Sequence, residues 1–155
     1  MAPETHGNKL TDDQIHALAS VLDAIIPPTE DGAFPGAGEI GLAGILNQKA
    51  PEFVPVLAAG LVALAELMAR REVTDFVSLD TDAKRSLLEE VASQQPTFLP
   101  GLLFQTYSNY YQHPRVLEAL GLHARAPYPL GYDLESGDMS LLDPVRRRGP
   151  RYRDC

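Results

Sequence analysis

The chain has 155 residues, 45% of them hydrophobic, which suits one globular domain that buries about 68–70% of its unfolded surface. Its net charge of −8 argues against nucleic-acid binding, which needs a basic surface. The longest apolar run, residues 53–65, is shorter than the roughly 20 residues of a membrane helix. We therefore expect a globular chain without a membrane span.

A first helix is predicted from Thr11 to Ile26. Thr11 and Gln14 fit a capping box, and the apolar residues that follow recur at helical spacing. Pro27 ends this helix because proline cannot continue the helical hydrogen-bond pattern. A loop rich in glycine and proline follows.

Asp23 is an acid within the apolar stretch VLDAII. A carboxylate in such a place must find hydrogen-bond donors. We expect it to accept backbone N–H groups from the loop around Gly36 and Gly38, or to pair with an arginine. This structural role is favoured over a catalytic one, since nothing nearby in the sequence supplies a base or a metal ligand.

The remaining periodic stretches predict an all-α fold, a compact bundle of about five to six helices. Pro114 suits the first turn of the last helix, and Gly121 suits its end. No stretch of alternating β-branched residues longer than four interrupts the pattern. The further predicted helices cover residues 39–47, 55–71, a stretch that begins at the Asp80 cap, 98–112 and 114–121.

An extended, proline-rich C-terminal arm is predicted over residues 122–155, after a flexible N-terminus (1–10) and the bundle domain (11–121). An arm of this length without regular structure is uncommon in a compact domain and tends to be functional or disordered. Tyr128 and Tyr132 are among several large apolar residues in it. Either the bundle or another chain must cover them.

The last ten positions hold five arginines, Arg146 to Arg148, Arg151 and Arg153. Residues 1–145 hold eight basic and 20 acidic residues, for a net charge of −12. The tail could dock on an acidic partner or fold back on its own chain. A solvated terminus is the simpler interpretation.

Recognisable catalytic motifs are missing. The sequence has no glycine-rich dinucleotide or phosphate loop, no HExxH metal motif and no GxSxG nucleophile motif. Its one cysteine, Cys155, permits no internal disulfide. His113 precedes Pro114 and is expected at a helix end. An independent enzyme that uses Asp23, His113 or His123 stays open as an alternative.

The opening stretch LTDDQIHALASVLDAIIPPTEDGAFPGAGEIGL resembles that of gluconate 2-dehydrogenase subunit 3 proteins, and so does a later Y-Y-x-x-P-x-V block. The resemblance covers roughly residues 10–133. The matching residues of the opening are Asp23, Ile25, Ile26, Pro27, Pro35, Gly36 and Ala37. The later ones are Phe76, Leu79, Tyr110, Tyr111, Pro114, Val116, Leu117, Leu120, Gly121 and the run Pro129 to Tyr132.

This resemblance implies a non-catalytic small subunit that stabilises a large flavoprotein of the glucose-methanol-choline type or assists its folding. FAD and catalysis belong to that partner, which oxidises sugars or alcohols, so no cofactor is expected in this chain. Through the large subunit the chain would also meet an electron-acceptor protein. No export signal precedes Leu10, which favours the cytoplasm; the periplasm fits if such a signal was removed.

Large aromatic residues near the arm are predicted to form the partner interface, because tyrosine gives a wide contact area with a polar tip. Packing on this chain's own helices is an equally good role for Tyr110 and Tyr111. A homo-oligomeric scaffold or regulatory module with an exchanged arm is a further alternative for the whole chain. The predicted interface residues are Tyr110, Tyr111, His113, Tyr128, Leu130 and Tyr132.

Overall fold

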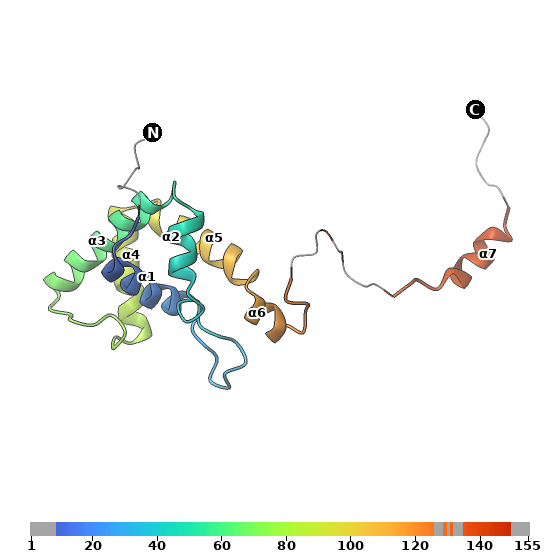
Figure 1. Cartoon of the computed structure of the whole chain (residues 1–155), viewed down its shortest axis with the longest axis horizontal. Coiled ribbons are helices and arrows are strands. Elements are labelled where there is room, and N and C mark those ends of the chain that lie inside the picture. Colours follow the sequence, from blue (N-terminus) through green and yellow to red (C-terminus); the bar gives the residue numbers. More distant parts are fainter. Residues whose placement is uncertain (1–8, 126–128, 130, 132–134, 150–155) are drawn as a thin grey trace, which may run out of the picture. The chain divides into compact units, whose positions relative to one another are not determined.

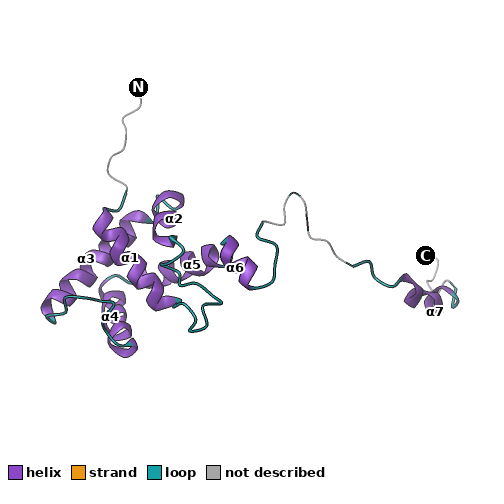
Figure 2. Cartoon of the chain, turned by 60° about the horizontal axis from the view of Figure 1, so that its bottom comes forward, coloured by secondary structure: helices purple, strands orange, loops and turns teal. Residues whose placement is uncertain are grey.

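The computed structural model describes residues 9–125, 129, 131 and 135–149. Within them every regular element is a helix, which confirms the predicted all-α fold (Figure 2). The chain divides into two compact units, residues 1–125 and 126–155, which are described separately. The first unit contains α1 (Asp12–Ile25), α2 (Leu42–Lys49), α3 (Val54–Arg70), α4 (Thr81–Gln94), α5 (Phe98–Tyr110) and α6 (Pro114–Ala119) (Figure 1).

Two helices begin at the caps predicted from the sequence. At α1, Thr11 Oγ1 accepts a hydrogen bond from Gln14 N at 3.3 Å, and Gln14 Oε1 accepts one from Thr11 N at 3.0 Å. At α4, Asp80 Oδ1 accepts from Ala83 N at 2.8 Å. These side chains satisfy first-turn N–H groups that have no partner inside the helix.

The second helix was predicted at residues 39–47, but α2 covers Leu42–Lys49. Gly41 is the residue before it and has a φ of 73°, in the left-handed region that glycine adopts without steric cost. A helix cannot run through this conformation. The boundary is therefore set by the backbone at Gly41, and no side chain caps α2.

α3 packs against α1, α4 and α5. Its Gly60 lies so close to the Phe98 ring that a Cβ atom there would overlap the ring. The absence of a side chain at Gly60 thus sets how closely α5 approaches α3. The side chains at the middle of the core are fully buried and come from four helices: Leu18, Leu22, Leu57, Leu87, Val91, Phe98 and Leu102.

The C-terminal unit contains two short helical elements, η1 (Met139–Leu142) and α7 (Asp143–Arg146). The prediction of extended coil throughout the arm is wrong for these residues. Asp138 caps the segment by accepting a hydrogen bond from Ser140 N at 2.9 Å, and Pro144 occupies the first turn of α7. None of the helices in the described residues has the length and apolar character needed to cross a membrane.

Candidate functional site

The loop of residues 27–41 is attached to α1 through Asp23. Asp23 Oδ1 accepts hydrogen bonds from Gly38 N at 2.7 Å and from Glu39 N at 3.3 Å. A Cβ atom at Gly38 would lie 2.7 Å from the second carboxylate oxygen, and one at Gly36 would also collide with Asp23. The donors predicted for Asp23 are therefore present, and both glycines are needed for this close approach.

Tyr110 attaches the same loop to α5. Its side chain is only 2% exposed, and its hydroxyl donates a hydrogen bond to Pro35 O at 2.8 Å. Burial raises the pKa of the Tyr110 hydroxyl, which keeps it protonated as a donor. Tyr110 thus lies within its own chain's core, the alternative stated above, and offers no surface to a partner.

A third attachment of the loop comes from α6. Arg115 forms an ion pair with Glu39 at 2.8 Å, and both side chains are about half exposed. The hydrogen bond from Arg115 lowers the pKa of the Glu39 carboxyl. The 27–41 loop is consequently held by α1, α5 and α6, although the sequence predicted only the contact with Asp23.

His113 and its neighbours connect α5 to α6. The His113 backbone carbonyl accepts hydrogen bonds from the N–H groups of Val116 and Leu117, both at 3.0 Å, so His113 stands at the start of α6. Its ring Nδ1 is buried without a hydrogen-bond partner in the described structure. Pro114 opens α6, and Gly121 has a φ of 72° just beyond its end. His113 thus marks the helix start, as predicted from its place before Pro114.

Three exposed aromatic side chains form a ridge along the outer side of α5. Phe104 is 69% exposed, Tyr107 47% and Tyr111 50%, and the Tyr107 and Tyr111 rings stack with centroids 6.4 Å apart. Their spacing of three and four residues places them on one side of the helix. We call Phe104, Tyr107 and Tyr111 the aromatic ridge; the opposite side of α5 is buried through Phe98, Leu102 and Tyr110.

The sequence prediction named Tyr111 but missed Phe104 and Tyr107. A signal was present, because α5 carries large apolar residues around most of its axis, a pattern typical of a helix covered on more than one side. In the described structure only one side is covered. The predicted interface residues Tyr128, Leu130 and Tyr132 lie outside the described residues, so their role stays a prediction.

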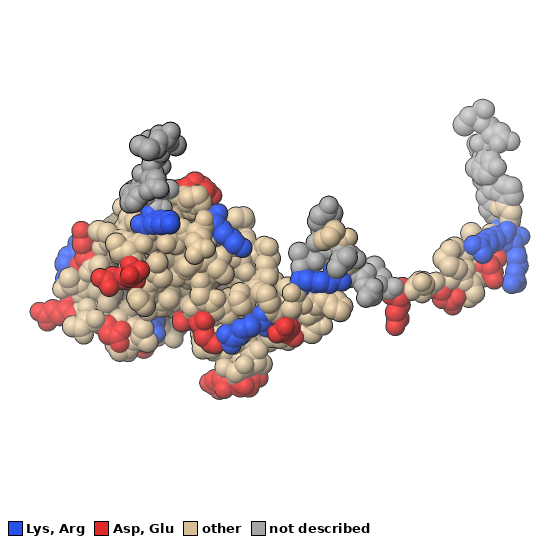
Figure 3. All heavy atoms as spheres, viewed as in Figure 1, with Lys and Arg blue, Asp and Glu red and all other residues tan. Residues whose placement is uncertain are grey.

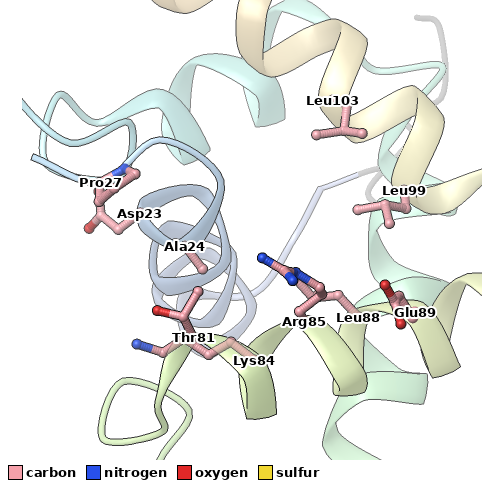
Figure 4. A pocket seen from close by; sticks show the side chains of 10 residues that line it. All are labelled: Asp23, Ala24, Pro27, Thr81, Lys84, Arg85, Leu88, Glu89, Leu99 and Leu103. Atoms are coloured by element: carbon pink, nitrogen blue, oxygen red, sulfur yellow. The ribbon is translucent and has the colours of Figure 1, made fainter.

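A cleft of about 500 Å³ lies beside the ridge, between α1, α4 and α5 (Figure 4). Leu88, Leu99 and Leu103 give it an apolar wall, while Lys84 and Arg85 stand on the α4 side. Figure 4 shows the Arg85 side chain extending across the cleft toward α1. Asp23 and Glu89 also line the cleft, so its two basic side chains are balanced by two acidic ones.

No group of three or more His, Cys, Asp and Glu side chains in the described residues is arranged to hold a metal ion. Asp23, the acid that lines the cleft from α1, already accepts two backbone hydrogen bonds. The surface features that stand out are apolar, while acidic groups are spread over the visible face of the first unit (Figure 3).

Comparison with known proteins gives one match. The family model described as gluconate 2-dehydrogenase subunit 3 matches residues 12–123. No curated protein and no solved structure matches the chain. The matched region contains the attached loop, the cleft and the aromatic ridge, and it stops before the C-terminal unit.

Proposed function

Because the chain belongs to the gluconate 2-dehydrogenase subunit 3 family, we propose that it is the non-catalytic small subunit of an FAD-dependent oxidoreductase that oxidises sugars or alcohols. Its partner is a large flavoprotein of the glucose-methanol-choline type, which carries the flavin and the catalytic groups. The small subunit stabilises that partner or assists its folding. An electron-acceptor protein meets the complex through the large subunit.

The observation that carries this proposal is the aromatic ridge. Phe104 alone is 69% exposed, and Tyr107 and Tyr111 extend the same apolar strip along α5. Aromatic side chains are enriched at protein interfaces, and tyrosine is common among the few residues that carry most of the binding energy. The ridge is also held firmly, since the other side of α5 packs against Gly60 of α3. A rigid aromatic surface loses little entropy on binding.

The neighbouring cleft supports the same proposal. Leu103 lines the cleft and is the sequence neighbour of Phe104 on α5. The apolar wall of the cleft and the ridge therefore meet along one helix. A partner could place an apolar segment in the cleft and cover the ridge at the same time. Such a contact would bury a larger surface and fix the position of the partner.

The test is coexpression of this chain with the large flavoprotein subunit, followed by copurification. A Phe104→Ser/Tyr107→Ser variant should copurify poorly and yield less soluble flavin-loaded partner, because the ridge has lost its apolar surface. The matched control is Val62→Ser, which removes a side chain that is 51% exposed on α3. The control should assemble as the wild type does.

Other outcomes would favour the other functions. Bound flavin or turnover in this chain purified alone would support an independent enzyme. A symmetric dimer that buries the ridge, with no affinity for the flavoprotein, would support the homo-oligomeric module. Normal assembly of the Phe104→Ser/Tyr107→Ser variant would place the interface elsewhere on the chain.

A further inference from the structure

The C-terminal unit carries an apolar cluster that nothing in the described residues of that unit covers. Its four large hydrophobic side chains are 42% to 73% exposed. They lie within seven residues of one another, so they form a dense apolar surface on a very short segment. Single exposed hydrophobic residues are normal, whereas several of them on one short segment indicate an interaction site. The four residues are Met139, Leu141, Leu142 and Val145.

The segment that holds this cluster is already shaped by local contacts. Asp138 caps η1 by accepting a hydrogen bond from Ser140 N, and hydrogen bonding from the Ser140 side chain and backbone lowers the pKa of the Asp138 carboxyl. Arg146 pairs with Asp143 at 3.4 Å within α7. We call residues 138–148 the terminal segment. A segment that is partly helical before it binds loses less entropy on docking.

Charge indicates what kind of surface the terminal segment fits. Arg146, Arg147 and Arg148 follow the apolar cluster directly, and blue atoms gather at α7 in Figure 3. Within the described residues only Arg146 of these three takes part in an ion pair. Two exposed guanidinium groups beside an apolar cluster complement an apolar groove that has carboxylates at its edge.

We propose that the terminal segment docks in an apolar groove with an acidic edge on the large flavoprotein subunit, as a second contact in addition to that of the aromatic ridge. This inference rests on the proposed function. The segment lies beyond residues 12–123, the region that the family model matches. Because both contacts belong to one chain, the second binds at a high effective concentration and strengthens the complex.

The test measures the dissociation constant of the full chain for the purified large subunit at about 0.1 M and about 1 M salt, where the Debye length is about 10 Å and 3 Å. Leu141→Ser/Leu142→Ser should weaken binding about tenfold or more at both salt concentrations. Arg147→Gln/Arg148→Gln should weaken it strongly at low salt and little at high salt. The control Lys49→Gln/Arg70→Gln removes the same charge from exposed positions in the first unit and should change binding less than about twofold.

Several results would overturn the inference. Wild-type affinity of both terminal-segment variants would refute it and leave the proposed function intact, whereas no binding by the wild-type chain would refute both. Binding of the segment to phosphatidylserine vesicles, with unchanged affinity of the variants for the large subunit, would assign it to a lipid surface. Slow amide hydrogen exchange at Leu141 and Leu142 in the chain alone would show that its own chain covers the segment.

Discussion

Replacing Asp23 by alanine would remove the side-chain attachment of the 27–41 loop to α1, while the backbone hydrogen bond from Ala37 N to Ile26 O stays. The substitution leaves two N–H groups without their acceptor, those of Gly38 and Glu39. The α1 helix itself should persist, since alanine is the best helix former. The expected effect is therefore a loss of stability centred on the loop.

The size of the effect follows from the two hydrogen bonds. The bond from Gly38 N is short, 2.7 Å, and partly buried, so stranding this donor costs about 1–3 kcal/mol. The bond from Glu39 N is longer, 3.3 Å, and exposed, so water can replace it. We expect Asp23→Ala to lower the free energy of unfolding by about 1–2 kcal/mol. For a chain of this size that lowers Tm by roughly 2–8 °C.

Urea unfolding followed by circular dichroism measures this loss, and Asp23→Asn is the matched control. Asparagine keeps a side-chain oxygen as acceptor, so it should lose much less stability than alanine does. Activity per assembled complex should change little in both variants. Unchanged stability of Asp23→Ala would show that the loop does not depend on this carboxylate. Loss of activity with normal stability and assembly would refute a purely structural role.

Two further outcomes are expected from the packing and the charges. Gly60→Ala should destabilise the fold by about 1–3 kcal/mol in urea unfolding, because its Cβ overlaps the Phe98 ring; Gly44→Ala in α2, with nothing within 4 Å, should instead stabilise by about 0.5–1 kcal/mol. Arg115→Met should raise the pKa of Glu39 toward its ordinary value of 4.5 in an NMR titration. Folding lowers the Glu39 pKa, so the ion pair stabilises the folded chain above pH 4.5. This stabilisation is lost as the pH falls through the lowered pKa. An unchanged Glu39 pKa in the variant would contradict this assignment.

The start of a helix could be predicted where nearby side chains cap it. Thr11 with Gln14, and Asp80, place the starts of α1 and α4 because a cap depends on residues three positions apart. The start of α2 was misplaced because Gly41 acts through its backbone conformation rather than through a side chain. The helical turns at Met139–Arg146 were missed because they are too short to show a period.

The candidate site was less predictable because it depends on which side of a helix is covered. Tyr110 and Tyr111 are neighbours in the sequence, yet one is buried and the other is half exposed. Their difference comes from the packing of α5 against α2, α3 and α4, which periodicity cannot specify for a helix that is apolar around most of its axis. The contact of Tyr110 with Pro35 spans 75 positions and has no local signal.

The three attachments of the 27–41 loop also set an order of events during synthesis. Asp23 precedes the loop, but Tyr110 and Arg115 follow their loop partners by 75 and 76 positions. At roughly 5–20 residues per second, a ribosome needs about 4–15 s to reach them. Until then the nascent chain can make only the first attachment. The loop therefore completes its native contacts only after α5 and α6 have left the ribosome. In truncated chains that end before Tyr110, the loop would be accessible to proteases.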